Sequence, residues 1–202
     1  GELIIFRERS TWSISGEGPS KTGIGEYYKP RQISATVGAL KNTPVLYTDS
    51  GIYFQNTRGI FRLGEGFEYI GAAVEDLVGS NRVVAIRHHQ GTETIRFAFS
   101  DKVLVHNYRY KTWSNYTYSL GEGETIVGME NLDDTIYVIT SADKVLKEDT
   151  SYKVGTNYIV MKLKTGWISF NEIQGFGRVY RFSILGESRD KHTLTVKVYY
   201  NY

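Results

Sequence analysis

Ile52-Tyr53-Phe54-Gln55-Asn56-Thr57-Arg58-Gly59-Ile60-Phe61-Arg62-Leu63 is the stretch that decides the fold. Two runs of β-branched and aromatic residues flank a short Asn/Gly turn, a pattern typical of an antiparallel hairpin. The first run returns as Ile95-Arg96-Phe97 and Ile136-Tyr137-Val138, at offsets of 43 and 41 residues. The second run returns as Val103-Leu104-Val105 and Val145-Leu146-Lys147, at offsets of 43 and 42 residues. Because two separate strand positions keep the same period, the sequence predicts a repeated hairpin.

The start of the chain fits as a fourth, less regular copy of this hairpin, formed by Leu3-Ile4-Ile5-Phe6 and Thr11-Trp12-Ser13-Ile14. A period of about 40–45 residues built from short antiparallel strands is typical of a β-propeller blade. A single blade cannot bury both of its faces, so neighbouring blades must stack. We therefore expect an all-β fold, with about four blades of an incomplete β-propeller in residues 1–150. The alternative is a β-sandwich with evenly spaced hairpins.

The period stops after about residue 150. A strand-like run, Tyr158–Leu163, leads into Thr165–Ile168, and the runs Arg178–Leu185 and Leu194–Tyr200 alternate in polarity. Strict alternation indicates strands with one buried and one solvated face. We expect residues 151–202 to form an antiparallel β region, either a second β-domain or strands that close the propeller. Because strand-like runs stand at both ends, we expect the chain to be a truncated piece of a longer polypeptide.

Composition excludes several classes of protein. The 202 residues include 24 Lys and Arg against 22 Asp and Glu, and this balance argues against a general nucleic-acid clamp. There are no cysteines, so disulfide scaffolds, thiolate zinc sites and cysteine nucleophiles are excluded. The apolar runs are too short for a transmembrane helix, so we expect no membrane span, and no signal peptide is visible.

Charge is distributed unevenly along the chain. Residues 81–118 hold six basic and two acidic side chains, residues 119–151 hold two basic and eight acidic, and residues 152–202 hold eight basic and three acidic. Alternating patches of this kind suit docking between copies or with partners of opposite sign, although plain solvated surface explains them equally well.

No catalytic or metal-binding motif emerges. The Gly-rich stretch Gly16–Gly25 contains Lys21-Thr22, but a phosphate-binding P-loop needs Gly before the Lys and a helix afterwards, so a turn-rich loop between blades is favoured. His88 and His89 are adjacent on a strand and point to opposite faces, which does not suit one metal ion. Asp133, Asp134 and Asp143 sit in turns without the spacing of a calcium loop. We expect no enzyme activity, no catalytic residue, no cofactor and no metal.

One stretch interleaves aromatic and cationic residues, from Asn107 to Tyr118. Exposed, such side chains stack on sugars or bases. Packed between blades, they fill apolar contacts while keeping a polar tip, and this second interpretation is favoured. The candidate interaction residues are Tyr108, Arg109, Tyr110, Lys111, Trp113 and Tyr116.

The order of strands and turns resembles the β-propeller structural proteins of short-tailed bacteriophages, which include tail nozzle proteins and tail-hub or packaged-DNA stabilisation proteins. The resemblance covers nearly the whole chain, and none of its motifs is catalytic or separates nozzle from hub. It rests on Leu3–Phe6, Ser15–Pro19, Tyr47–Phe54, Arg58–Leu63, Tyr69–Glu75, Val105–Tyr108, Thr112–Ser114, Gln174–Val179 and the run Leu194–Tyr200.

The resemblance implies a virion protein in the tail, assembled as a homo-oligomeric ring, expected to be a hexamer, below the portal and adaptor. Such a ring extends the DNA channel, retains the genome and releases it at infection. Contact with genomic DNA is expected to be transient, because each phosphate contact adds affinity that retards passage. Two alternatives remain open, a carbohydrate-binding or carbohydrate-active propeller and a cellular scaffold propeller that binds a peptide.

Overall fold

A computed structural model describes residues 2–16, 18–26, 28–118, 120–148, 153–154, 157–158, 181, 183 and 193–199. The chain divides into two compact units, residues 1–159 and residues 160–202. In the described part of the first unit almost all regular structure is β-strand. The exceptions are three helices of one turn, η1 (Gly71–Val74), α1 (Glu75–Val78) and η2 (Gln90–Thr92).

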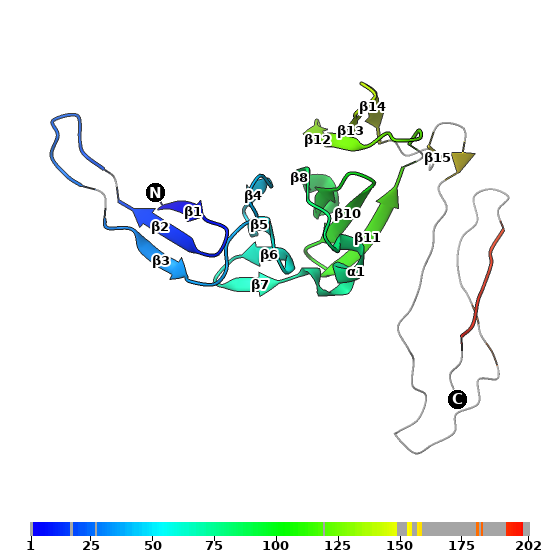
Figure 1. Ribbon diagram of the computed structural model, residues 1–202, viewed down its shortest axis with the longest axis horizontal. Coiled ribbons are helices and arrows are strands. Elements are labelled where there is room, and N and C mark those ends of the chain that lie inside the picture. The colour runs from blue at the N-terminus through cyan, green and yellow to red at the C-terminus, as the bar shows by residue number, and fades with distance from the viewer. Residues whose placement is uncertain are drawn as a thin grey trace, which may run out of the picture. The chain divides into compact units, whose positions relative to one another are not determined.

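Strands β1 to β14 form four consecutive antiparallel sheets, and in each sheet the strands pair in the order of the chain. This is a partial β-propeller of repeated blades, as the sequence predicts (Figure 1). Blade 1 contains β1 (Glu2–Phe6), β2 (Thr11–Ser15) and β3 (Arg31–Ser34), and blade 2 contains β4 (Val45–Thr48), β5 (Gly51–Asn56), β6 (Gly59–Leu63) and β7 (Phe67–Tyr69). Blade 3 contains β8 (Ala85–His89), β9 (Thr94–Ala98), β10 (Lys102–Asn107) and β11 (Thr112–Thr117), and blade 4 contains β12 (Ile126–Leu132), β13 (Thr135–Thr140) and β14 (Val145–Lys147).

Each of the four predicted hairpins forms two adjacent strands of one blade. They are β1–β2, β5–β6, β9–β10 and β13–β14, each with antiparallel register. The predicted repeat did not include the strand that precedes the hairpin in blades 2 to 4, although His88 and His89 of β8 were expected on a strand. It also did not include the strand that follows the hairpin in blades 1 to 3. The preceding strands β4, β8 and β12 contact one another from blade to blade. When the blades are aligned on their hairpins, β1, β2 and β3 of blade 1 correspond to the second, third and fourth strands of blades 2 and 3.

Local backbone chemistry explains the tight turns. Asp133 and Asp134 join β12 to β13 with positive φ values of 49° and 58°. A two-residue turn with both φ values positive matches the twist of a hairpin, and Asp tolerates this conformation better than most residues. Gly59 begins β6 with a φ of 132°, and a Cβ there would press against the ring of Tyr69. Both turns therefore depend on their residue type.

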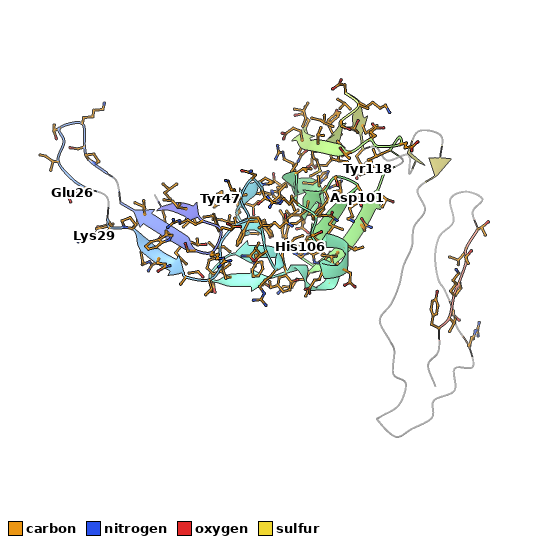
Figure 2. The ribbon with its side chains drawn as sticks, viewed as in Figure 1. Glu26, Lys29, Tyr47, Asp101, His106 and Tyr118 are labelled. Carbon is orange, nitrogen blue, oxygen red and sulfur yellow. The ribbon has the colours of Figure 1, made fainter. Side chains whose placement is uncertain are left out.

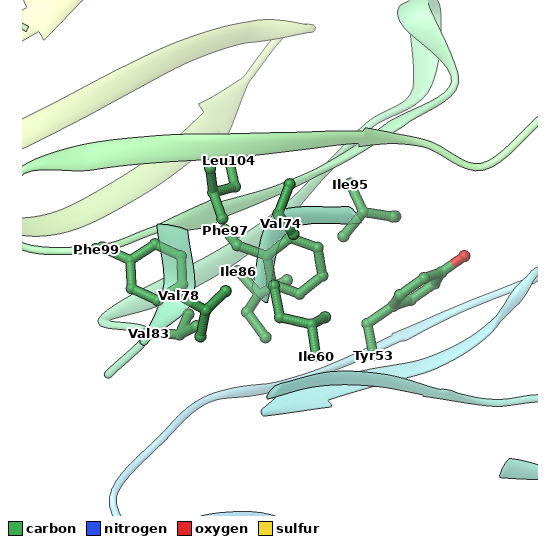
Figure 3. Packing of buried hydrophobic residues seen from close by; sticks show 10 residues of the cluster. All are labelled: Tyr53, Ile60, Val74, Val78, Val83, Ile86, Ile95, Phe97, Phe99 and Leu104. Atoms are coloured by element: carbon green, nitrogen blue, oxygen red, sulfur yellow. The ribbon is translucent and has the colours of Figure 1, made fainter. Parts of the chain in front are cut away.

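The largest core cluster lies between blades 2 and 3. Blade 2 contributes Tyr53 and Ile60, and blade 3 contributes Phe97 and Leu104, all fully buried. The connection between the two blades adds Val74 and Val78 from the short helices. Figure 3 shows these side chains converging from both sheets. Burying a side chain of this size contributes about 1.5–3 kcal/mol, so stacking of blades is the main source of stability here.

Each blade therefore has two faces with different neighbours. We call the face turned to the preceding blade the leading face and the face turned to the following blade the trailing face. Between blades 1 and 2 the trailing residue Phe6 packs on the leading residues Phe54 and Phe61. Between blades 3 and 4 the trailing residues Ala98 and Val103 pack on the leading residue Val138. Strand alternation separates the two faces, since successive side chains point to opposite sides.

The Gly-rich stretch lies inside blade 1 rather than between blades, which corrects the predicted location. It belongs to the long connection between β2 and β3. Glu26 and Lys29, labelled in Figure 2, lie on this connection away from the sheet. Its described turn is closed by the backbone of Ser20, whose carbonyl oxygen accepts from the amide of Gly23 at 2.8 Å. Blade 1 keeps its strand order despite the long connection between β2 and β3, because the hairpin β1–β2 fixes the register.

Beyond blade 4, the described part of the chain is small. Strands β15 (Lys153–Val154) and β16 (Asn157–Tyr158) pair antiparallel, which agrees with the predicted further antiparallel strands. Residues 193–199 form no strand within the described part of the chain. Most of Tyr158–Leu163, Thr165–Ile168 and Arg178–Leu185 lies outside the described residues. The predicted boundary at residue 150 and the predicted β region 151–202 stay predictions.

Candidate interaction surface

Three turns gather candidate interaction residues and polar side chains at one end of blades 3 and 4. In an antiparallel sheet the first-to-second and third-to-fourth turns lie at the same end. For blade 3 these are the β8–β9 turn and the β10–β11 turn, and a backbone hydrogen bond from Tyr108 to the carbonyl oxygen of Glu93 joins them at 3.2 Å. The β12–β13 turn of blade 4 lies beside the β8–β9 turn, because Asp134 accepts a hydrogen bond from the amide of Gly91 at 3.2 Å. We call these three turns the turn surface.

The β10–β11 turn holds four of the six predicted interaction residues, and Arg109, Tyr110 and Lys111 are the exposed ones. The Asn107 carboxamide oxygen accepts from the amides of Arg109 and Tyr110 at 3.1 and 2.9 Å, which shapes the turn. The Arg109 guanidinium lies 3.2 Å from the Glu93 carboxylate and 5.6 Å from the centroid of the Tyr110 ring. Tyr110 is 69% exposed. The turn therefore exposes the Tyr110 ring and the adjacent Arg109 guanidinium to solvent.

Lys111 completes the exposed part of this turn. Its ammonium lies 3.8 Å from the carboxylate of Glu68 in blade 2. Lys111 itself has a φ of 54°, so it ends the turn in the left-handed region. Arg109, Tyr110 and Lys111 are thus brought together, and both cations have an acidic neighbour. This pairing lowers the positive charge that the turn offers to an anionic ligand.

Tyr108 and Trp113 pack against the core cluster between blades 2 and 3. The Trp113 indole N–H donates to the carbonyl oxygen of Ile70 at 3.0 Å, and its ring lies 5.6 Å from the ring of Phe97. The Tyr108 hydroxyl lies 3.3 Å from Nε2 of His88, and burial raises the pKa of this hydroxyl. These two residues therefore have the packing role that the sequence favoured for the whole stretch.

Tyr116 lies apart from the turn, on the outer strand β11. The Arg96 guanidinium lies 5.7 Å from the centroid of its ring, while the ring itself stays partly exposed. The six candidate residues therefore divide into an exposed turn, an inter-blade pair and an outer-strand aromatic. Their role in binding stays a prediction.

A polar hollow of about 410 Å³ lies between the β8–β9 turn and the β12–β13 turn. Gly91 contributes a bare backbone, because a Cβ at this position would collide with the Asp134 carboxylate. The Asn131 side chain donates to the carbonyl oxygen of His88 at 2.7 Å, while its own oxygen is buried without a partner in the described structure. The lining residues are His88, Gln90, Gly91, Asn131, Asp133 and Asp134.

Sequence reasoning missed this hollow, although the repeat carried a signal for it. Gly91 and Asp134 are 43 residues apart, as are His88 and Asn131. Residues one period apart occupy the same place on consecutive blades, so their side chains meet when the blades stack. The sequence predicts Asp133 and Asp134 as turn residues, and the structure adds the contact of Asp134 with the Gly91 amide.

His88 and His89 contact different partners. His88 meets Tyr108, while Nδ1 of His89 lies 2.8 Å from the Thr92 hydroxyl and 3.6 Å from Asp134. This arrangement agrees with the predicted opposite orientation of the two rings. In the described ranges, no group of three or more His, Cys, Asp and Glu side chains is placed to hold a metal ion. A third histidine, His106, is buried against Trp113 with ring centroids 4.6 Å apart, and burial lowers its pKa (Figure 2).

Opposite charges meet between blades 3 and 4. Arg87 of blade 3 donates two hydrogen bonds to the Glu130 carboxylate, at 2.8 and 3.0 Å. Arg96, whose side chain is 5% exposed, pairs with Glu148. Part of the basic stretch 81–118 is thus matched to the acidic stretch 119–151 within one chain. The sequence had suggested docking between copies or with partners, and the structure places these contacts between consecutive blades.

Two further titratable groups lie around blade 4. Hydrogen bonds from the Thr140 hydroxyl, the Gly121 amide and the Lys144 ammonium lower the pKa of Glu124 to about 2. Through these hydrogen bonds the Glu124 carboxylate links the segment before β12 to the end of β13 and to the β13–β14 turn. Burial raises the pKa of the Tyr118 hydroxyl to about 12 (Figure 2). Both groups keep one charge state near neutral pH, which suits a structural role.

Within the residues described, no helix has the length and apolar character that crossing a membrane requires. No protein-family model matches the chain, and no curated protein matches it. Similar solved structures do exist. One is the extracellular domain of a candidate hybrid two component system from B. thetaiotaomicron, with a TM-score of 0.49 and 12% identity over 74% of this chain and 20% of that chain. Another is the Neurospora crassa Pan2 WD40 domain, with a TM-score of 0.42 and 15% identity over 75% of this chain and 47% of that chain.

This chain spans about a fifth and about a half of those two proteins, respectively. At such identities a likeness concerns the fold alone, and at such TM-scores it supports no conclusion about function. The assignment to a partial propeller therefore rests on the blades themselves, on their strand order, their common register and their stacking.

Proposed function

We propose that this chain is a structural propeller segment in the tail of a short-tailed bacteriophage, in either the nozzle or the hub. In this role it stands in a homo-oligomeric ring, expected to be a hexamer, below the portal and adaptor. The virion setting comes from the resemblance in strand and turn order. The mechanical part of the proposal comes from contacts between the blades.

The mechanical part of the proposal is supported by three polar contacts between blades, each of which joins residues one repeat apart in the sequence. Arg87 binds Glu130, Asn131 binds the backbone of His88, and Trp113 binds the backbone of Ile70, each across 43 residues. Each contact ties equivalent places on neighbouring blades, at the margin of an apolar cluster. Hydrogen bonds between two elements must be broken before the elements separate, and an unpaired buried polar group is costly. A wall that retains packaged DNA needs this resistance to separation between blades.

The exposed cations support only weak contact with DNA. Arg109 and Lys111 each lie beside an acidic residue, Glu93 and Glu68. A phosphate must therefore compete with a carboxylate for each cation. We expect binding of duplex DNA that is weak and is lost with added salt, because neutralised phosphates release counterions. Tight duplex binding by the isolated chain in a mobility-shift assay would count against a channel that lets DNA pass.

Labelling of particles tests the virion setting. Antibody raised against this chain is applied to phage particles from the source and detected with gold in the electron microscope. The proposal predicts label confined to the tail of a short-tailed virion. Particles without label, together with the protein in the soluble fraction of the cell, would overturn the proposal. Antibody absorbed beforehand with the purified chain is the control for specificity.

One observation favours a second candidate, a carbohydrate-binding propeller. The hollow on the turn surface is lined by amide and carboxylate groups, among them Gln90, Asn131 and Asp134, with the exposed ring of Tyr110 on the neighbouring turn. Such groups hydrogen-bond hydroxyls, and exposed aromatic rings stack on sugar faces. A glycan array probed with the chain and with Asp134→Asn distinguishes the candidates. Binding lost in Asp134→Asn and kept in Asp76→Asn, on the distant α1, would support the sugar site.

A further inference from the structure

The two end blades each have one apolar face that the described structure leaves uncovered. Residues paired across the hairpin allow a direct comparison of equivalent positions. On the trailing face of blade 3, the cross-strand pair Ala98 and Val103 is 0% exposed. The equivalent pair on blade 4 is Ile139 and Val145, which are 39% and 62% exposed. The uncovered pair is thus the larger one, because Ile139 stands where blade 3 has Ala98.

The equivalent pair on the first two blades is covered. Gln55 and Ile60 on blade 2 are buried against blade 3. On blade 1, Thr11 is fully buried and its partner Phe6 is partly buried against Phe54. Val127, at the bulge of β12, adds to the uncovered apolar area of blade 4. Only the last trailing face of the described blades lacks a neighbour.

The leading face of blade 1 is uncovered in the same way. Its cross-strand pair is Ile5 and Trp12, and Ile5 is 39% exposed. The equivalent pair on blade 2, Phe54 and Phe61, is buried against blade 1. Leu3 is also exposed, and it extends the same face. Blade 1 therefore exposes a leading face and blade 4 exposes a trailing face, the two halves of an inter-blade contact.

We propose that a second copy of this chain covers these faces, with the trailing face of blade 4 on one copy stacked on the leading face of blade 1 on the next. The repeat argues for this occupant, because a trailing face meets a leading face at all three junctions within the chain. Exposed aliphatic side chains at positions that are otherwise buried provide the driving force. The contact is head to tail, so it generates a ring or an open array. The inference stands on these faces and does not rest on the proposed tail function.

Charge-bearing substitutions on each face test the proposal separately. Ile139→Glu blocks the trailing face and Ile5→Glu blocks the leading face, at exposed positions that tolerate a polar side chain in the single chain. Sedimentation velocity on the full chain measures mass over a range of concentrations. We expect the wild-type chain to associate and each variant to remain monomeric. Leu77→Glu, on α1 and similarly exposed at 36%, is the matched control and should associate as the wild type does.

A mixture of the two variants gives the decisive result. One unblocked trailing face and one unblocked leading face remain, so an equimolar mixture should form a 1:1 heterodimer and nothing larger. Formation of this heterodimer also shows that both variants are folded. A wild-type chain that stays monomeric would overturn the proposal, as would variants that still associate alone or a mixture that remains monomeric. A monomeric chain that binds a different polypeptide through Ile139 would equally overturn it.

Discussion

The junction between blades 2 and 3 and the junction between blades 3 and 4 hold the same fold together by different means. The first buries aromatic and long aliphatic side chains, such as Tyr53, Phe97 and Leu104. The second has small trailing residues, Ala85 and Ala98, and adds the ion pairs Arg87–Glu130 and Arg96–Glu148. The comparison shows that blades of the same repeat can be joined either by large buried apolar side chains or by small apolar side chains together with ion pairs. The two junctions should therefore respond differently to truncation, salt and acid.

The largest effect is expected from truncation of Phe97. Its side chain is fully buried in the junction between blades 2 and 3, and it contacts the rings of Tyr53 and Trp113. Phe97→Ala should lower the free energy of unfolding by about 3–5 kcal/mol, through lost burial and the cavity left behind. Urea denaturation followed by intrinsic fluorescence measures this change. Ile139→Ala, on the uncovered face, should change the unfolding of the monomer by only about 0.5 kcal/mol. Equal costs at the two sites would contradict the assignment of covered and uncovered faces.

The second largest effect concerns the ion pair between blades 3 and 4. Glu148→Ala leaves the guanidinium of Arg96 nearly buried without its carboxylate. We expect a loss of about 2 kcal/mol, the range for a hydrogen bond to a charged group. The double variant Arg96→Met with Glu148→Ala should recover stability, because it removes the stranded charge. A double variant less stable than Glu148→Ala alone would show that the arginine contributes by packing rather than by pairing.

A smaller effect is expected at the turn surface. Gly91→Ala forces the Asp134 carboxylate away from the backbone of the β8–β9 turn. Loss of that one hydrogen bond should cost about 1 kcal/mol in the free energy of unfolding. Thermal denaturation with Gly66→Ala as the control measures it, since a Cβ at Gly66 meets no neighbour. If both variants melt together, the two turns do not brace each other in solution.

The exposed ion pair should contribute least at neutral pH. Arg87 and Glu130 are both substantially exposed to solvent. A double-mutant cycle with Arg87→Ala and Glu130→Ala should give a coupling energy of about 0.2–1 kcal/mol that falls with added salt. The apolar junction between blades 2 and 3 has no such pair among its core residues, so Phe97→Ala should show little dependence on salt. A coupling that salt leaves unchanged would indicate a buried rather than a surface pair.

One effect is confined to acid solution. The pKa of Glu124 is about 2 in the fold, against an ordinary value of 4.5. Because the folded-state pKa is lowered, the carboxylate stabilises the fold above pH 4.5, and this contribution is lost as the pH falls from 4.5 through 2. Glu124→Gln should be less stable than the wild type near neutral pH and should match it below pH 2. A difference that stays constant from pH 6 to pH 2 would contradict the lowered pKa.

The hairpins could be predicted from the sequence because their signals are local. Ile52–Phe54 and Ile60–Leu63 combine β-branched and aromatic residues with a turn, and the same pattern recurs at a fixed offset. Strands β4 and β8 could not be placed in the same way. Val45–Thr48 and Ala85–His89 also pair with the next strand across a turn, but their residues do not recur at the period that marks the hairpin runs.

Burial could not be predicted within the aromatic stretch. Trp113 and Tyr110 are three residues apart in similar surroundings, yet one packs between blades and the other faces solvent. What separates them is the position of blade 2, which reaches Trp113 through the backbone of Ile70 and does not reach Tyr110. The polar hollow was missed for the same reason, since its walls come from turns one period apart.

Hydrogen exchange on the full Ile139→Glu chain, dilute enough to be monomeric, tests the central claim that inner blades are covered on both faces and end blades on one. Exchange protection reports the free energy of opening, which tracks buried contacts. We predict the slowest exchange in β9 and β10 of blade 3 and markedly faster exchange in β2 and β13, which are also inner strands of their sheets. Protection in β2 and β13 equal to that in β9 would contradict the claim, because the end blades would then have neighbours that the described blades do not supply.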